Sequence, residues 1–233
     1  MKLIAIETSE RIGSLFALAR GTDSGDMAVG LRLPAGSRSA QTLAPCLAEL
    51  LQKTGWRAID LDAVAVSSGP GSFTGLRIGV TTAKLLAYAA GCRVVEVNTL
   101  RAIAAQAAEP GQAGWVVMDA QRSELFAARV DATGELGPVE IVPQADWLAG
   151  LKPGEWVAGP ALAKLVARLP EGVSPAAEES WAPTAETIGR LAAKAVEAGQ
   201  TTDPVDVTPK YFRPSAAEEK RAAEEKRQSQ AAG

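Results

Sequence analysis

Short apolar runs, separated by turn-prone residues, dominate the first 33 positions of the chain. Their pattern predicts a three-stranded antiparallel meander over Lys2–Glu7, Ser14–Arg20 and Met27–Leu33. The first run holds one Lys and four consecutive apolar residues, which is too few for a signal peptide or a membrane span. We therefore expect this run to be the first strand of a folded domain.

The hydrophobic period then changes from that of a strand to that of a helix. Leucines recur at helical spacing over Ser39–Thr54, which predicts an amphipathic helix that ends before Gly55. Pro45 falls inside this pattern. Because proline is best tolerated in the first turn of a helix, we expect the helix to begin near Thr42.

From residue 63 onward, strand-like and helix-like segments alternate. Strands are expected at Ala63–Ser67, Arg93–Val97, Trp115–Asp119, Ser123–Val130, Pro138–Val142 and Glu155–Ala158. Helices are expected at Leu76–Ala90, Thr99–Glu109, Gln144–Leu151, Pro160–Leu169 and Ala185–Ala198. This alternation after a meander indicates an α/β protein with mixed sheets. Both halves pair strands with helices, as in a duplicated fold, although the sequence repeat itself is faint.

Composition excludes several kinds of chemistry. The 233 residues include 24 Lys and Arg against 27 Asp and Glu, a formal charge of −3, and no His. The missing His excludes His-based catalytic triads, Cys–His dyads and zinc sites built on imidazole. A pI near 5.2 argues against a protein that binds nucleic acid without a partner. Cys46 and Cys92 lie in apolar surroundings, which favours reduced thiols in a cytosolic protein.

The sharpest local feature is the segment from Ser67 to Gly91, which reads as strand, glycine-rich loop and helix. Glycines allow close approach of the backbone, and free amides at a helix start attract anions. The loop is not a Walker A motif, because no Lys follows the glycines before Lys84. A phosphate contact and a purely structural turn stay open as alternatives. The residues of the candidate anion loop are Thr8, Ser9, Gly69, Gly71, Ser72 and Thr74.

The helix expected at Leu76–Ala90 lacks a polar half. Only Arg77 and Lys84 are charged, and apolar residues spread over more than one face. A surface helix normally shows a polar side to solvent. This helix is therefore either enclosed within the domain or packed against another subunit.

Four motifs together resemble the TsaB (YeaZ) family, which serves the synthesis of threonylcarbamoyladenosine in tRNA. GPGSFTGLRIG at 69–79 is close to the family signature, and IAIETS at 4–9 resembles its first strand and turn, where relatives usually carry Asp instead of Glu7. MDAQRSELFAA at 118–128 resembles the DAR-type hairpin of the family, with Gln121 interposed before Arg122. PKYFR at 209–213 resembles its closing motif, so that the resemblance covers residues 1–213.

The resemblance implies a two-lobed α/β fold of the actin/Hsp70/sugar-kinase type, with mixed sheets flanked by helices. The N-terminal lobe would comprise residues 1–105 and 185–199, the second lobe residues 106–184, and the C-terminal tail residues 200–233. The tail carries AAEEKR twice, at 216–221 and 222–227. Six residues do not repeat with a helical period and form no apolar stripe, so we expect a solvated helix or a partly disordered tail.

The implied role is that of a noncatalytic partner of the related catalytic subunit TsaD. Threonylcarbamoyladenosine would form at position 37 of tRNAs that decode ANN codons, and no residue of this chain would be catalytic or bind a metal. Helices Thr42–Thr54 and Leu76–Ala90 would form an intersubunit bundle. Where many relatives carry His just before that first helix, this chain has Ser39, so the role of that His does not transfer. The implied interface residues are Leu43, Leu47, Leu50, Leu76, Val80, Ala83, Leu86 and Ala87.

The resemblance also implies further partners. TsaD would form a heterodimer with this chain, TsaE would be a second partner, and tRNA would be reached only through the complex. A homodimer of the chain alone and ATP or ADP at the complex are left open. No cofactor of the chain alone, no membrane contact and a cytoplasmic location are expected. Arg77 and Arg213 would contact a partner or RNA, or serve within the chain.

Two hypotheses in which the chain is an enzyme stand beside the noncatalytic partner role. In a small-molecule kinase or ATPase of the same fold, Glu7, Thr8 and Ser9 would form a first phosphate loop, with Asp119 near a second. In a peptidase, one of Ser67, Ser68 and Ser72 would be the nucleophile, and Lys84 would have to activate it without a His base.

Overall fold

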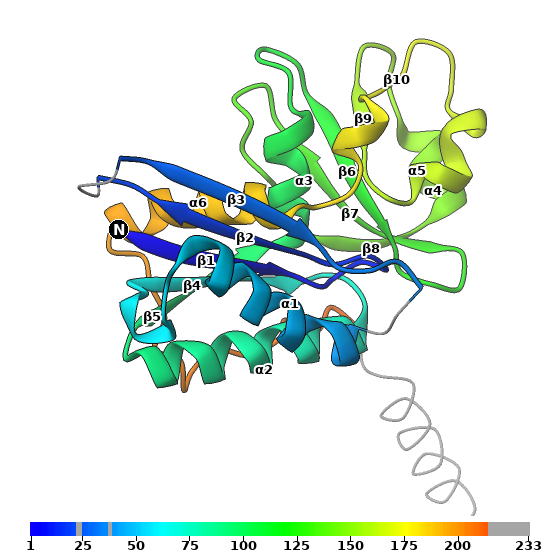
Figure 1. Ribbon diagram of the computed structural model, residues 1–233. Helices are drawn as coiled ribbons and strands as arrows, with labels where there is room; N and C mark the ends of the chain where they lie inside the picture. The colour runs from blue at the N-terminus through cyan, green and yellow to red at the C-terminus, as the bar shows by residue number, and fades with distance from the viewer. Residues whose placement is uncertain (22–24, 37–38, 214–233) are drawn as a thin grey trace, which may run out of the picture.

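The computed structural model describes residues 1–21, 25–36 and 39–213. Five layers follow one another through the molecule: helices, a sheet, helices, a second sheet and helices (Figure 1). The AAEEKR repeats and part of the link between the second and third predicted strands lie outside the described residues. Each sheet is buried between two helical layers, which explains the nearly continuous apolar runs of its central strands.

The first sheet has the strand order β3-β2-β1-β4-β5. β1 pairs antiparallel with β2, which in turn pairs antiparallel with β3, so the expected meander is confirmed. β4 and β5 run parallel to β1. Alternate side chains of β1 point to opposite faces, and both faces are buried. The strands are β1 (Lys2–Glu7), β2 (Ser14–Ala19), β3 (Met27–Arg32), β4 (Ala63–Gly69) and β5 (Arg93–Asn98).

The second sheet repeats this topology. Its order is β10-β9-β6-β7-β8, with β6, β7 and β8 as an antiparallel meander and β9 and β10 parallel to β6. The first lobe, defined by the first sheet, and the second lobe, defined by the second sheet, therefore share one connectivity, as expected of a duplicated fold. The strands are β6 (Gly114–Asp119), β7 (Glu124–Val130), β8 (Glu140–Pro143), β9 (Trp156–Ala158) and β10 (Ser174–Pro175).

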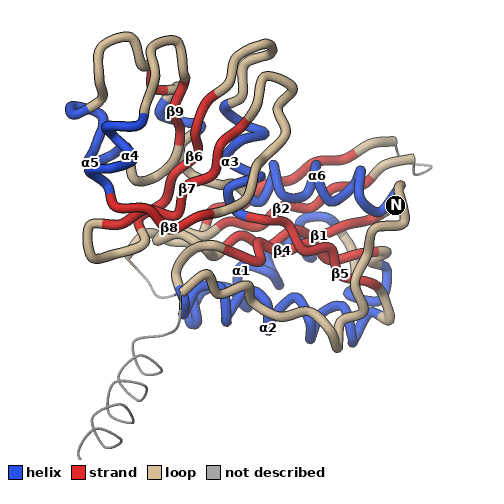
Figure 2. The backbone as a smooth tube through the Cα atoms, turned by 180° about the vertical axis from the view of Figure 1, so that it is seen from behind, coloured by secondary structure: helices blue, strands red, loops and turns tan. Residues whose placement is uncertain are grey.

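Three pairs of helices cover the two sheets. α1 (Ser39–Thr54) and α2 (Phe73–Ala90) cover the outer face of the first sheet, and α6 (Ala185–Glu197) covers its inner face (Figures 1 and 2). α3 (Thr99–Ala107) packs against the inner face of the second sheet. The outer face of that sheet is covered by α4 (Gln144–Gly150) and α5 (Leu162–Leu165). The described residues also form short 3-10 turns, η1 (Ala58–Asp60), η2 (Val166–Arg168) and η3 (Glu178–Ser180).

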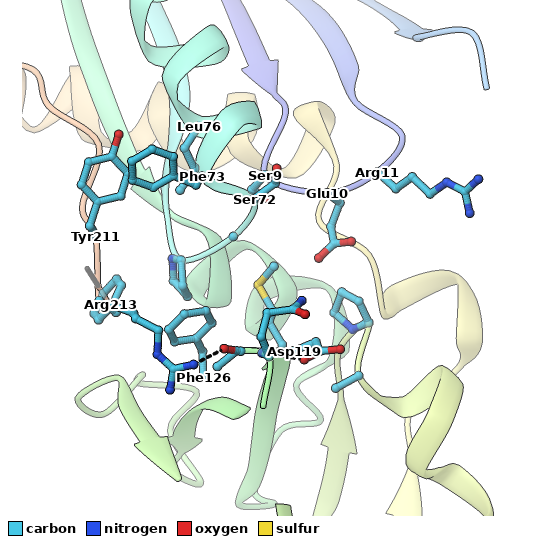
Figure 3. A pocket seen from close by; sticks show the side chains of 18 of the residues that line it. Ser9, Glu10, Arg11, Ser72, Phe73, Leu76, Asp119, Phe126, Tyr211 and Arg213 are labelled. Carbon is cyan, nitrogen blue, oxygen red and sulfur yellow. Dashed lines mark hydrogen bonds between the residues drawn. The ribbon is translucent and has the colours of Figure 1, made fainter. Parts of the chain in front are cut away.

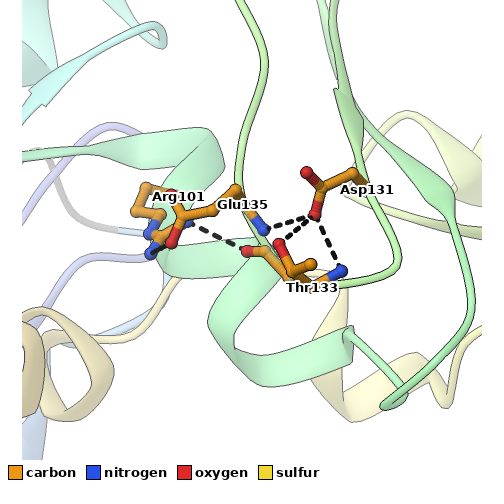
Figure 4. A network of polar contacts seen from close by, with 5 residues as sticks. Arg101, Asp131, Thr133 and Glu135 are labelled. Atoms are coloured by element: carbon orange, nitrogen blue, oxygen red, sulfur yellow. Dashed lines mark hydrogen bonds and ion pairs between the residues drawn. The ribbon is translucent and has the colours of Figure 1, made fainter.

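A polar network holds the inner helix α3 to the hairpin that follows β7 (Figure 4). Arg101 of α3 donates to the backbone oxygen of Gly134 at 3.0 Å and pairs with the carboxylate of Glu135. Asp131 accepts hydrogen bonds from the side chain and amide of Thr133 and from the amide of Glu135. The hydroxyl of Thr133 and these amides hold the pKa of Asp131 below its ordinary value. The network fixes this loop on the helix that lies between the two sheets.

Two sequence predictions need correction. α1 begins at Ser39, so Pro45 lies well inside the helix and not in its first turn. Pro45 and Gln41 are both exposed, so water can satisfy the carbonyl that loses its intrahelical partner. The helix expected at Pro160–Leu169 is also wrong in part: it divides into α5 and η2. The two-residue strand β10 went unpredicted because it is too short to show a period.

Residues 200–213, assigned at the sequence level to the C-terminal tail, pack along the first lobe and then reach the second. Thr202 pairs with Val94 at the edge strand β5, and Val207 is buried in the core beneath α1 and α2. No helix among the described residues is both long and apolar enough to cross a bilayer.

Candidate functional site

A cleft of about 1020 Å³ lies between the two lobes (Figure 3). It opens where the C-terminal ends of β1 and β6 face each other, which is the edge where α/β sheets usually hold ligands. Its walls come from four stretches of chain: residues 9–11, 70–73, 118–122 and 210–213, with Lys164 and Leu165 of α5 closing one side. Every motif that carried the family resemblance contributes to this cleft.

The candidate anion loop is assembled, but the protein itself fills it. The amide of Ser72 donates to the carbonyl of Ser9 at 2.7 Å, and the hydroxyl of Thr8 donates to the carbonyl of Gly75 at 2.8 Å. A Cβ on Gly71 would lie 2.6 Å from the Cβ of Ser9, and a Cβ on Gly75 would collide with the carbonyl oxygen of Thr8. The glycines are therefore needed for the approach of one loop to the other.

The remaining residues of that loop are not directed at a common point. Ser72 caps α2 by accepting from the amide of Gly75 at 3.2 Å. Thr74 is exposed on the helix. Gly69 packs against the carbonyl of Lys210 and not against Thr8 or Ser9.

Glu7 lies beneath this loop and is fully buried. Its Oε1 accepts from the amide of Ser9 at 2.6 Å, from the hydroxyl of Ser9, and from the hydroxyl of Ser67 at 3.2 Å. Its Oε2 has no partner. Desolvation raises the pKa of Glu7 to about 7, against the opposing effect of those hydrogen bonds. The residue is a structural carboxyl beneath the cleft, because it does not line the cavity.

Two carboxylates face each other across the cleft, and their pKa values are shifted in opposite directions. Glu10, from the first lobe, extends toward Asp119 of the second lobe (Figure 3). Burial raises the pKa of Glu10, and the negative charge of Asp119 raises it further. Burial also raises the pKa of Asp119, but Lys164 at 2.9 Å and the amide of Gln121 outweigh it, so the net shift is downward. Asp119 therefore stays ionised under conditions in which Glu10 can hold a proton.

The turn that follows Asp119 is strained, which the sequence did not reveal. Gln121, Arg122 and Ser123 all have positive φ angles, of 66°, 54° and 60°. Three successive side-chain-bearing residues in the left-handed region are unusual, at a cost of about 1–2 kcal/mol each. The one available signal was the extra Gln121 in a motif that otherwise resembles the family. Strain of this kind often occurs at binding sites.

The interface residues expected on α1 and α2 are all buried in the chain on its own. Seven of them pack in the core that these helices form with the first sheet, and Leu76 lines the cleft. The outer side of α2 instead exposes Leu85 (65%) and Tyr88 (77%). Val205, 71% exposed, lies beside them, because Lys84 of α2 donates to its carbonyl at 2.9 Å. The helix thus covers the core on one side and shows apolar side chains on the other, and its packing against another subunit stays a prediction.

The residues that a peptidase would need are occupied elsewhere. Ser67 donates to Glu7, the hydroxyl of Ser68 to the carbonyl of Val97, and Ser72 caps α2. Lys84 donates to the carbonyls of Val205 and Val207, both at 2.9 Å, and contacts none of the serines. Within the described parts of the chain, no group of three Asp, Glu or Cys residues is arranged to hold a metal.

Comparisons with known proteins agree on one family. The family model described as TsaD: tRNA N6-adenosine threonylcarbamoyltransferase matches residues 34–218, more than half of the chain. The tRNA threonylcarbamoyladenosine biosynthesis protein TsaB of Haemophilus influenzae is 33% identical over 132 residues, which are 56% of this chain and 54% of that protein. TsaB of Bacillus subtilis is 29% identical over 156 residues, 65% of this chain and 66% of that protein. The matched part thus spans between half and two thirds of these relatives.

A solved structure extends the similarity to nearly the whole fold. YeaZ from Pseudomonas aeruginosa superposes with a TM-score of 0.73 and 27% identity, covering 91% of this chain and 99% of that one. The two-lobed α/β architecture expected from the sequence is confirmed. The chain therefore belongs to the family that this model describes and, within it, to the TsaB (YeaZ) proteins.

Proposed function

We propose that this protein is the noncatalytic partner of TsaD in forming threonylcarbamoyladenosine at position 37 of ANN-decoding tRNAs. The observation that carries the proposal is the filled loop on the first-lobe side of the cleft. Thr8 and Ser9 contact Gly71, Ser72 and Gly75 directly, so the first phosphate loop of an active kinase or transferase of this fold has no free cradle here. The names of its relatives supply the pathway.

The surface that we propose for TsaD is the outer side of α2. Leu85, Tyr88 and the neighbouring Val205 expose apolar side chains there, and large exposed apolar side chains that gather on one face favour protein contact. This face replaces the buried set expected from the sequence. It keeps the location on α2 and changes the residues that make contact.

The other expectations complete the proposal. TsaE is a second partner, tRNA is reached through the complex, and the same face of α2 would support a homodimer when TsaD is absent. The chain alone holds no cofactor, and ATP or ADP, where it takes part, binds in the complex. We place the protein in the cytoplasm, in keeping with the reduced, unpaired Cys46 and Cys92.

A small-molecule kinase or ATPase stays the second candidate because of the cleft itself. Asp119 and Glu10 line a cavity large enough for a nucleotide. The arrangement differs from the expected one, since Glu7 and Thr8 are buried behind the wall and, of the three, only Ser9 lines the cavity. Titration of the purified chain with ATP and Mg²⁺ separates the two candidates: micromolar binding supports the kinase, and its absence supports the partner.

The docking face is tested with Leu85→Asp combined with Tyr88→Asp, measured by co-purification with TsaD and by modification of tRNA in a reconstituted system. We expect at least a tenfold loss of TsaD binding. Ile12→Asp is the matched control, because Ile12 is a similarly apolar, exposed residue of the loop after β1. Full TsaD binding by the double variant would refute this face, and failure of the unaltered protein to bind TsaD would refute the proposed function.

A further inference from the structure

The last described segment of the chain ties the two lobes together. Thr202 forms two backbone hydrogen bonds with Val94 of β5, at 2.7 and 3.0 Å, and Asp203 pairs with Arg93 at 2.7 Å. Val207 then enters the core of the first lobe. Up to this point the segment belongs to the first lobe alone.

Two cations on α2 hold the middle of the segment. The ammonium of Lys84 donates to two of its carbonyls, those of Val205 and Val207. Arg77 donates to the hydroxyl of Tyr211 at 2.9 Å, and its guanidinium lies 4.1 Å from the centre of the Phe73 ring. The ring of Tyr211 stacks on Phe73 with centroids 4.4 Å apart. Arg77, Phe73 and Tyr211 thus form one stack at the N-terminal end of α2.

The crossing itself takes only four residues, Lys210–Arg213. The amide of Lys210 donates to the carbonyl of Ser68 in the first lobe at 2.8 Å. Phe212 then packs into the core of the second lobe, where its ring meets Phe126 at 6.1 Å between centroids. Arg213 donates to the carbonyl of Ala120 at 2.6 Å and pairs with Glu124. Both of these partners flank the strained turn at the rim of the cleft.

The short span makes this segment mechanically important. The backbone of four residues reaches at most about 14 Å, and the side chain of Arg213 adds only its own length, so the anchor on Ser68 and the anchor on Ala120 cannot move far apart while both hold. The same four residues line the cleft. Opening the cleft on this side therefore requires that one anchor be released.

We propose that residues Pro209–Arg213 are a latch that sets the separation of the lobes, and that docking on α2 releases it. Arg77 and Lys84 lie on the docking side of α2. Arg77 holds the latch at Tyr211, and Lys84 holds the segment just before it at Val205 and Val207. A partner that engages these two cations competes with Tyr211 and with the carbonyls of Val205 and Val207. The coupling rests on the proposed function, whereas the latch itself is a property of the chain alone.

The latch is tested on the free, full-length protein by measuring the distance between the lobes. Spin labels on Ile12→Cys and Ala163→Cys, in a Cys92→Ser background, place one probe on each side of the cleft, and both sites are exposed. We expect Arg213→Ala and Tyr211→Ala to increase the width of the distance distribution at least twofold. Tyr211→Phe keeps the ring and should give a smaller change. Arg190→Ala, which removes an ion pair within α6 and a cation–π contact with Phe16 of the first lobe, is the control.

Hydrogen exchange gives a second readout that simple loss of stability would not reproduce. Faster exchange should be confined to the turn at 119–124 and the segment 209–213, with the first sheet unchanged. Distance distributions equal to those of the unaltered protein in both alanine variants would overturn the latch. If TsaD binds and the distribution stays unchanged, the coupling is wrong and the proposed function stands. If TsaD does not bind, the proposed function and the coupling are both refuted. The latch is then tested by the distance distributions of the two alanine variants alone.

Discussion

The carbonyl oxygen of Thr8 occupies the space that a side chain at residue 75 would need. The loop after β1 and the start of α2 therefore approach each other more closely than any residue with a Cβ would permit. Gly75 is thus required by the fold and not by a ligand. A Cβ on Gly79, one turn later, would collide with the hydroxyl oxygen of Thr8.

Gly75→Ala should lower the free energy of unfolding by about 1–3 kcal/mol or more, because a backbone carbonyl cannot move aside as a flexible side chain can. Urea denaturation monitored by circular dichroism measures the change. Gly150→Ala is the matched control: nothing lies within 4 Å of a Cβ at that position in α4, and its φ is not positive. Equal stability of the Gly75 variant and the unaltered protein would contradict the close packing described here.

Glu7 should make the stability depend on pH. Its pKa in the folded protein is about 7, above the ordinary 4.5, so the folded state binds one more proton than the unfolded state between these values. The contribution is fully present below pH 4.5 and is lost as pH rises through 7, for a total of about 3 kcal/mol. Unfolding free energies of the unaltered protein should therefore fall over this window.

Glu7→Gln provides the comparison for that titration, because a neutral amide cannot lose a proton. The variant should show a flatter profile between pH 4.5 and 7 and a relative gain in stability at pH 8. The remaining slope reports other groups, among them Glu10, whose pKa is also raised. Parallel profiles of the two proteins would show that Glu7 does not titrate in this range.

Ser72→Ala should remove the cap of α2 at a cost of about 1 kcal/mol. Ser72→Asp should restore most of the loss, since its carboxylate can accept from the same amide of Gly75. Thermal unfolding of the three proteins distinguishes them. A loss of the same size in the Asp variant would mean that Ser72 acts through something other than the cap.

Gln121→Gly should stabilise the protein by about 1 kcal/mol, because glycine adopts the left-handed conformation of this turn without steric cost. Ala149→Gly in α4 is the contrasting control and should destabilise by about 1 kcal/mol, because its site is helical. Destabilisation in both variants would indicate that the side chain of Gln121 makes a contact that outweighs the strain.

The sequence predicted the elements well because their hydrophobic periods were clear. It failed where one residue type serves two purposes. A glycine-rich loop before a helix can leave room for a phosphate or for another loop of the same chain, and only the positions of Thr8 and Ser9 decide between them. Likewise, the apolar residues of α2 surround the helix, so their pattern could not separate the buried Leu86 from the exposed Leu85.

The segment that crosses between the lobes was recognised as a motif, but its contacts could not be predicted. It has no regular period, and many of its contacts are made by backbone atoms: the carbonyls of Val205 and Val207 and the amide of Lys210. The long side chains of Lys84 and Arg77 reach Val205 and Tyr211 across more than a hundred positions of sequence. Arg213 reaches Ala120 across more than ninety. Such pairings depend on the tertiary fold and leave no local trace.

The shared connectivity of the two sheets has a consequence for fragment complementation. The link between α3 and β6 is exposed at Glu109–Gln112, and each side of it holds one complete five-stranded sheet. A protein divided there would yield a first fragment whose inner face keeps α3 but lacks α6, and a second fragment that carries α6, the helix that covers most of this face. The two pieces would recognise each other through a surface that neither can bury alone, so co-expressed halves should reassemble without a covalent link.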